Sequence, residues 1–459
     1  MTTQALDDGN TMTLTSNRQI AQLYQGIVRN KTNRVFTVGA GSSLAAKSAG
    51  AVFLLLAQIV AARVLGAAEY GYFAYAQNLL IILSIFTILG FDVSLLRFIP
   101  EYQVRQEWAE LKGILSFSFR SSLLFSGAMT LLLMLFLGLF PTVFTEKQTI
   151  PLLIMSFSIP LYSLTMIRQS ALRGFKHIVL AELPESIIRP LVFILALLIF
   201  SRFYAPVDAA QAWLIYLGVV LLTFLIGTGL LVRAIPPLTL SKSETESRQW
   251  TRISLDMMWM NAMNVIFNQA SLFLLGFYAD VIDIAYFSAA TRIAFFISFT
   301  LTAVNSIAAP MISELYHAQK HEELQNIMRL SAAFLGVVTL FTVLILSLWG
   351  KPILGFFGNE FPQAYKLLLL LMLGHAFKSF SGPASFLLNM SGNQKAMGRV
   401  MFCFMLFHLV INFLLIPRYA ATGAAIATAV TMVLWNVSLA YMSVRFVKID
   451  PTIFSLKSE

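Results

Sequence analysis

Residues 114–139 read ILSFSFRSSLLFSGAMTLLLMLFLGL, an apolar and small-polar run in which Arg120 is the one charged side chain. A helix rises about 1.5 Å per residue, so about 20 such residues cross the hydrocarbon core of a bilayer. Similar runs follow one another along the chain, separated by breakers such as Gly66, Pro141 and Pro206. They predict an all-α polytopic membrane protein of about twelve transmembrane helices. The predicted spans are residues 44–65, 73–96, 114–139, 150–170, 178–200, 211–232, 253–277, 284–309, 331–350, 366–389, 399–416 and 421–444.

The overall composition also indicates a membrane protein. Of the 459 residues 58% are hydrophobic and 12% are charged, whereas soluble domains have roughly 45–50% apolar and 25% charged residues. A soluble core cannot bury that much apolar surface. The single cysteine, Cys403, excludes a disulfide framework.

The distribution of basic residues predicts the orientation in the membrane. If the N-terminus is cytoplasmic, most of the 32 Lys and Arg residues, Arg168 among them, fall on the cytoplasmic side. Cytoplasmic loops are enriched in these residues, so both termini are expected in the cytoplasm. The net charge of +10 then reflects this bias and attraction to anionic lipid, and requires no nucleic acid partner. The opposite side holds Arg63, Lys147, Arg202, Lys351, Lys366 and Arg418.

The longest polar stretch between spans, from Arg233 to Arg252, divides the chain into two sets of six predicted spans. Equal halves that start on the same side of the membrane indicate parallel repeats around a central cavity. The predicted parts are a cytoplasmic N-terminal tail (1–43), a first six-helix lobe (44–233), a cytoplasmic linker (234–252), a second six-helix lobe (253–445) and a cytoplasmic C-terminal tail (446–459).

Charged side chains deep in a span mark candidate functional positions. Lys378 lies near the middle of the span at 366–389, one turn after His375, and Arg292 lies about 12 Å inside the span at 284–309. A charge near the bilayer centre costs roughly 2.5–3.5 kcal/mol, so such residues usually face a cavity. Both cations are therefore expected in a water-filled lumen.

The span at 178–200 must include charged residues, because its purely apolar part, Leu191–Phe200, is too short to cross a bilayer. Glu185 and Arg189 stand four residues apart and can pair on one helical face, with Glu182 one turn earlier. Two interpretations remain open: a structural ion pair near the interface, or a site for a coupling proton or sodium ion.

The span at 253–277 carries Asn261, Asn264 and Asn268 at helical spacing. This polar stripe can line the lumen and bind sugar hydroxyls, or it can hydrogen-bond a neighbouring helix. Arg120 lies only about six residues inside its span and can snorkel to the interface. Asp256 lies near a span end, where solvation or capping is the simplest role.

Several short motifs then occur in a characteristic order and spacing, although each is weak alone. They are Ala62-Arg63-Val64-Leu65-Gly66, Leu89-Gly90-Phe91-Asp92, Ala171-Leu172-Arg173-Gly174, Ile353-Leu354-Gly355-Phe356-Phe357-Gly358 and Leu387-Leu388-Asn389-Met390-Ser391-Gly392. In this combination the chain resembles the polysaccharide (O-antigen type) flippases of the multidrug/oligosaccharidyl-lipid/polysaccharide (MOP) exporter superfamily. The resemblance implies two six-helix lobes, as in the MATE transporters, and alternating access in the bacterial inner membrane.

The same resemblance implies the substrate and partners. Undecaprenyl-diphosphate-linked oligosaccharide units would be carried to the periplasmic leaflet for O-antigen, capsule or exopolysaccharide biosynthesis. No bound cofactor or metal is expected, and a proton or sodium gradient would drive transport. A polysaccharide polymerase and a chain-length regulator are expected partners, beside membrane lipids.

Three alternatives are weighed against this function. Lipid II flippases carry arginines inside the first span, where this chain has Ala57 and Gln58, and drug or cation exporters depend on acidic residues that are scarce in these spans. A glycan polymerase or ligase typically needs a large periplasmic loop, which the predicted spans do not leave. No metal-binding spacing, glycine-rich phosphate loop or nucleophile elbow occurs, so a transporter is expected and not an enzyme.

The hypothesis assigns candidate roles to the charged and polar positions. Basic lumen residues would attract the diphosphate and any acidic sugars, because a cation exerts a strong field in a low-dielectric vestibule. The candidates are Arg292, Lys378, Arg189 and Arg120 for substrate binding, Glu182, Glu185, Asp256 and His375 for ion coupling, and Asn261, Asn264 and Asn268 for sugar contacts.

Overall fold

The computed structural model describes residues 8–234 and 247–453, and every regular element in these two ranges is helical. The elements are α1 (Asp8–Ile88), α2 (Phe91–Arg105), α3 (Trp108–Leu139), α4 (Glu146–Ser156), α5 (Ser158–Gly174), α6 (Ile178–Glu182), the π-helix η1 (Leu183–Ile188), α7 (Arg189–Phe203), α8 (Ala209–Ala234), α9 (Ser247–Tyr278), α10 (Val281–His317), α11 (His321–Gly355), the 3₁₀-helix η3 (Phe361–Ala364), α12 (Tyr365–Phe380), α13 (Ala384–Met390) and α14 (Gln394–Val447).

The helices confirm the all-α polytopic membrane class. Among the described residues, seven helices are long and apolar enough to cross a membrane, or nine if each of two bent pairs counts as one span. Two of the long helices contain a non-helical residue, Gly66 in α1 and Ala420 in α14, and so each has two arms. With these arms and α9 counted, every predicted span has a helical counterpart, which is consistent with twelve.

Several predicted spans are not continuous helices. The prediction of an unbroken helix over 73–96 is wrong, because α1 ends at Ile88 and Gly90 adopts a left-handed φ of 76° before α2 begins. A Cβ at Gly90 would collide with the backbone of α9 at Ser254, so the break allows close packing of two helices. The bends of 42° between α4 and α5 and of 43° between α12 and α13 likewise interrupt predicted spans.

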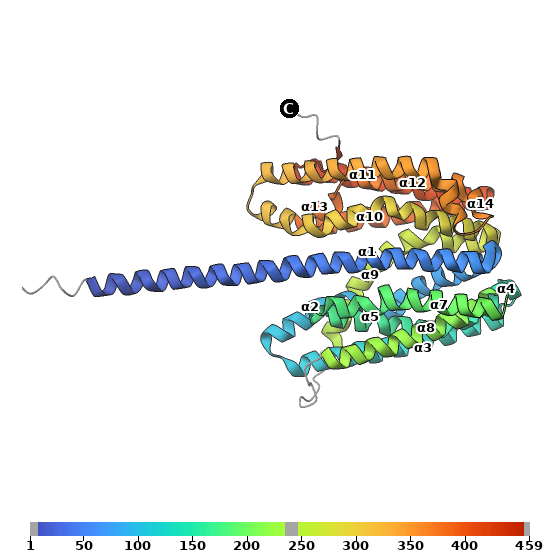
Figure 1. Ribbon diagram of the computed structural model, residues 1–459, viewed down its shortest axis with the longest axis horizontal. Coiled ribbons are helices and arrows are strands. Elements are labelled where there is room, and N and C mark those ends of the chain that lie inside the picture. Colours follow the sequence, from blue (N-terminus) through green and yellow to red (C-terminus); the bar gives the residue numbers. More distant parts are fainter. Residues whose placement is uncertain (1–7, 235–246, 454–459) are drawn as a thin grey trace, which may run out of the picture.

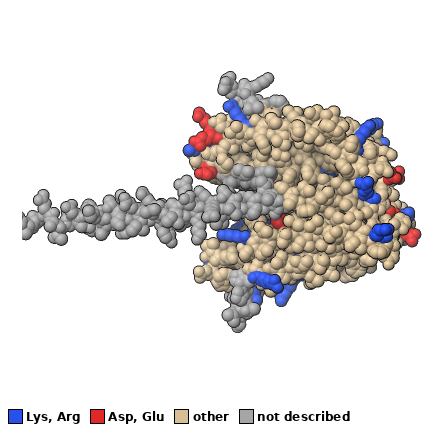
Figure 2. All heavy atoms as spheres, viewed as in Figure 1, with Lys and Arg blue, Asp and Glu red and all other residues tan. Residues whose placement is uncertain are grey.

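The helices form two bundles on either side of α1 and α9 (Figure 1). The first lobe contains α2, α3, α5, α7 and α8, and the second contains α10 to α14. On the face seen in Figure 2, charged side chains gather mostly toward the two ends, and few are visible in the broad band between them. Such a band is what the hydrocarbon core of a bilayer requires.

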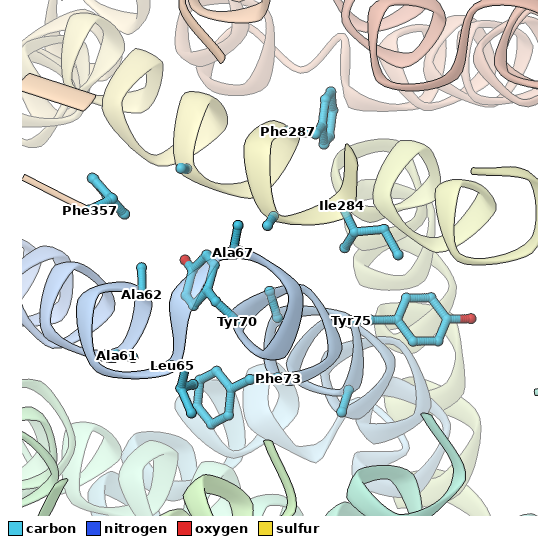
Figure 3. Packing of buried hydrophobic residues seen from close by; sticks show 14 of the residues in the cluster. Ala61, Ala62, Leu65, Ala67, Tyr70, Phe73, Tyr75, Ile284, Phe287 and Phe357 are labelled. Carbon is cyan, nitrogen blue, oxygen red and sulfur yellow. The ribbon is translucent and has the colours of Figure 1, made fainter. Parts of the chain in front are cut away.

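The two lobes share one apolar core at one end and have separate cores at the other. The shared cluster includes Tyr70 and Phe73 of α1, Trp213 of α8, and Ile284 and Phe287 of α10. Figure 3 shows the α1 and α10 members of this cluster beside one another. At the opposite end the cores separate, one around Phe91, Leu95, Ile114, Ile167 and Trp250 and the other around Ile312, Leu324, Leu387 and Leu439. Under the predicted orientation the joined end is periplasmic, so the lobes part toward the cytoplasm.

Candidate functional site

A cavity of about 770 Å³ lies between the two lobes. Its walls come from α1, α5, η1, α7 and α8 on one side and from α9, α10, α12 and α14 on the other. The Lys and Arg residues that line it are Arg189, Arg292 and Lys378, and Glu185 supplies a carboxylate. Arg292 and Lys378, which the sequence places deep in their spans, and Arg189 therefore line a common space. Their role in binding stays a prediction.

Arg292 joins the two lobes. Its Nη2 donates a hydrogen bond of 2.8 Å to Oε1 of Gln77 on α1. Gln58 donates to the same oxygen at 3.2 Å, and the Tyr70 hydroxyl donates to Oε1 of Gln58 at 3.1 Å. One residue further along α1, the Asn78 amide donates to Oε1 of Gln269 on α9 at 2.7 Å. Sequence reasoning missed these amides as site residues, because they carry no charge and do not form a stripe at helical spacing as the asparagines of α9 do.

Lys378 and His375 lie one turn apart on α12. Nδ1 of His375 is 2.9 Å from the Ser298 hydroxyl on α10, which fixes the orientation of the imidazole ring. Lys378 forms no ion pair with any described residue, and its side chain lines the cavity. Its amino group is therefore free to contact an anion in the cavity.

A buried cluster lies behind Arg189. Glu185 pairs with both Arg189 and Arg168, and the Arg168 side chain is 1% exposed. Nη1 of Arg168 also donates to the Thr223 and Phe224 carbonyl oxygens of α8, each at 3.1 Å. One carboxylate thus faces two guanidinium groups, which leaves excess positive charge beside the cavity. The π-helix η1, which contains Glu185, directly precedes Arg189.

Arg168, which the sequence counts among the basic residues of the cytoplasmic side, is buried between α5, α8 and η1. The one signal that could have found it is its position inside the predicted span at 150–170. Its burial depends on the absence of a side chain at Gly227, where an added Cβ would overlap the Arg168 guanidinium. No local sequence pattern reveals that pairing of α5 with α8.

Gly227 and Gly229 provide a matched pair for testing this packing. We expect Gly227→Ala to lower thermal stability, because Arg168 must move and lose buried hydrogen bonds to the α8 carbonyl groups. Gly229 has no atom within 4 Å of an added Cβ, so Gly229→Ala should be neutral or stabilising, since alanine favours helix by about 1 kcal/mol over glycine. Thermal unfolding of both variants in detergent measures this. Equal melting temperatures would contradict the packing described for Arg168.

The remaining predicted site residues divide between cavity and protein contacts. Asn264 and Asn268 line the cavity, whereas Asn261 donates a hydrogen bond of 3.1 Å to the Asp92 carboxylate and is not among the lining residues. Glu182 binds the Arg173 guanidinium at 2.7 Å and accepts from Gln169 at 3.3 Å, away from the cavity walls. Arg120 and Asp256 are exposed and do not line the cavity.

His408 lies in a polar network of the second lobe. Its Nε2 is 3.1 Å from Nδ2 of Asn412 and 3.2 Å from the Ser271 hydroxyl, and its Nδ1 is 3.1 Å from the Thr431 hydroxyl. Both ring nitrogens therefore have partners, as in a satisfied buried histidine. Within residues 8–234 and 247–453, no group of three or more His, Cys, Asp or Glu side chains is arranged to hold a metal ion.

Comparison with known proteins gives family and fold matches. Residues 36–316 match the family model described as polysaccharide biosynthesis protein, and residues 257–414 match the model described as MatE. No curated protein matches the sequence.

Among solved structures, the chain is similar to an inward-facing multidrug resistance transporter of the MATE family in the MOP superfamily, with a TM-score of 0.71, 13% identity, and coverage of 87% of this chain and 95% of that chain. It is similar to the lipid II flippase MurJ in an inward closed conformation, with a TM-score of 0.68, 18% identity, and coverage of 92% and 90%. A MOP transporter from Pyrococcus furiosus, described as having a binding pocket of reverse polarity, has a TM-score of 0.61, 14% identity, and coverage of 93% and 96%. At these identities the likeness establishes the fold.

Proposed function

Because this chain belongs to the polysaccharide biosynthesis protein family within the MOP superfamily, we propose that it is the flippase for undecaprenyl-diphosphate-linked oligosaccharide units. It is a membrane transporter and not an enzyme. In the proposed function it acts in the bacterial inner membrane, with both termini cytoplasmic, and supplies O-antigen, capsule or exopolysaccharide biosynthesis. A polysaccharide polymerase and a chain-length regulator would act next to it.

The observation that carries this proposal is the excess of cations in the cavity. Arg189, Arg292 and Lys378 face a space that contains one carboxylate, and Arg168 shares that carboxylate from behind. Between lobes of low dielectric constant, fixed cations attract anions strongly. Guanidinium and ammonium groups are also strong hydrogen-bond donors to phosphate oxygens. A diphosphate therefore fits the cavity, and the lipid tail can stay in the bilayer.

In the proposed mechanism, the hydrogen bond between Arg292 and Gln77 couples diphosphate binding to movement of the two lobes. A diphosphate in the cavity would compete with Gln77 for the Arg292 guanidinium, because a charged acceptor forms the stronger hydrogen bond. Losing that bond would weaken one contact between the lobes at their joined end, and the lobes could rock toward an outward-facing state. A proton or sodium gradient would supply direction, with Glu185 and His375 as the candidate coupling residues that line the cavity.

A drug exporter is the second candidate, because the MatE model matches residues 257–414. The net positive charge of the cavity argues against a cationic drug as the substrate, because Arg292 and Lys378 would repel it. The likeness to MurJ keeps lipid II as an alternative lipid-linked substrate. A drug exporter and a lipid II flippase would each transport a different molecule in the reconstitution assay described next.

Reconstitution into proteoliposomes tests the proposed function. We expect the full-length protein to move a fluorescent undecaprenyl-diphosphate oligosaccharide between leaflets, faster under an imposed proton or sodium gradient. Lipid II and an organic cation such as ethidium serve as competing cargo in parallel vesicles. Transport of ethidium without movement of the oligosaccharide lipid would overturn the proposal in favour of a drug exporter, and movement of lipid II alone would reassign the substrate.

A further inference from the structure

The helices that line the cavity differ in the chemistry of their side chains. All four charged lining residues belong to η1, α7, α10 and α12. The wall formed by α9 and α14 contributes no Asp, Glu, Lys or Arg among its described lining residues. It presents instead the amides of Asn264, Asn268 and Asn436 and the rings of Phe267 and Trp435. A ligand that fills the cavity therefore meets cations from η1, α7, α10 and α12, and neutral polar and aromatic groups from α9 and α14.

The indole ring of Trp435 on α14 is held in one orientation and is partly exposed. Its ring centroid lies 6.4 Å from that of Phe267 and 5.8 Å from that of Phe404, the latter in an edge-on arrangement. Such ring pairs restrict the orientation of the indole. The side chain is half-buried and lines the cavity, and its N–H donates no hydrogen bond to the described residues. The indole thus has both an apolar face and a polar group to offer to a ligand.

The neighbouring amides are arranged as a donor and acceptor pair. Nδ2 of Asn268 donates to Oδ1 of Asn264 at 2.8 Å and to its backbone carbonyl oxygen at 2.6 Å. These bonds fix the Asn268 side chain and leave its Oδ1 as an acceptor, while Nδ2 of Asn264 remains a donor. Both side chains are exposed. An adjacent acceptor and donor match two neighbouring hydroxyl groups on one ring.

We propose that the α9/α14 wall is a subsite for an uncharged sugar ring, with Trp435 as the stacking surface and the Asn264–Asn268 pair as the hydroxyl-binding group. This inference rests on the proposed function and adds to it the recognition of the glycan. The C–H face of a pyranose is apolar and packs on an aromatic ring, while its hydroxyl groups need hydrogen-bond partners. The diphosphate would bind the cations contributed by α7, α10 and α12.

The test compares binding of two lipids to the full-length protein in nanodiscs. The probes are bare undecaprenyl diphosphate and undecaprenyl diphosphate carrying a neutral disaccharide. We expect Trp435→Ala to bind the bare lipid normally and the glycolipid about tenfold more weakly, from the size of aromatic contacts. Trp435→Phe, which keeps a ring, should lose less, and Trp349→Ala on the exposed side of α11 should lose nothing.

Each outcome has a distinct meaning. Equal weakening of both lipids by Trp435→Ala, or no weakening of either, would overturn the sugar subsite. If Trp435→Phe binds the glycolipid as weakly as Trp435→Ala, stacking is also refuted. If wild-type protein binds bare undecaprenyl diphosphate no better than undecaprenol, the proposed function fails, whatever the Trp435 variants show.

Discussion

Lys378→Ala and Arg292→Ala should each abolish surface polysaccharide in cells that depend on this protein, while the amount of protein in the membrane stays normal. Each variant removes a cation from the cavity wall. Hydrogen bonds to charged groups contribute about 1.5–3 kcal/mol, which corresponds to a loss of diphosphate affinity of about tenfold to a hundredfold. Immunoblotting of the polysaccharide and of the protein measures both quantities.

Lys366→Ala is the matched control for this experiment. Lys366 lies on the same helix, α12, but it is exposed and does not line the cavity. We expect normal polysaccharide from this variant. Normal polymer from both Lys378→Ala and Arg292→Ala would remove these residues from the binding site. Loss of polymer in Lys366→Ala as well would show that the assay reports damage to α12 and not the charge in the cavity.

Glu185→Gln should give the largest loss of stability. The carboxylate of Glu185 faces the guanidinium groups of Arg168 and Arg189, and all three side chains are at most 12% exposed. Removing one partner of a buried ion pair costs about 3–5 kcal/mol, because a charge stays buried without compensation. Here two cations would remain next to each other. The free energy of unfolding should fall accordingly, which a lower melting temperature in detergent would reveal.

Two further variants test whether that loss of stability comes from the buried ion pairs of Glu185. Glu101 pairs with Arg97 and Arg105 at the surface of α2, so Glu101→Gln should cost less than about 1 kcal/mol. Combining Glu185→Gln with Arg168→Met removes one of the two buried cations, and it should restore part of the stability. Equal melting temperatures for Glu185→Gln and Glu101→Gln, or no recovery in the double variant, would contradict the buried cluster.

Part of the candidate site was predictable from depth alone. Lys378 and Arg292 interrupt long apolar runs, and the cost of a charge in a bilayer predicts that they face a polar space. For Arg189 the sequence left open a structural ion pair and a coupling site. The same argument cannot place Asn261, whose amide binds Asp92 on α2, although Asn264 and Asn268 on the same stripe reach the cavity. Helical spacing defines a face, and only the neighbouring helices decide what covers each part of that face.

The sequence by itself determined the class of protein and the approximate spans, because apolar runs of membrane-spanning length permit hardly any structure other than helices across a bilayer. It also determined which cations lie too deep to reach water at an interface. The tertiary structure alone decided that Arg168 is buried against Gly227 and that Trp435 shares a cavity with Lys378. These relations join residues of different helices. They depend on side-chain shape at contacts between helices, which no local pattern along the chain encodes.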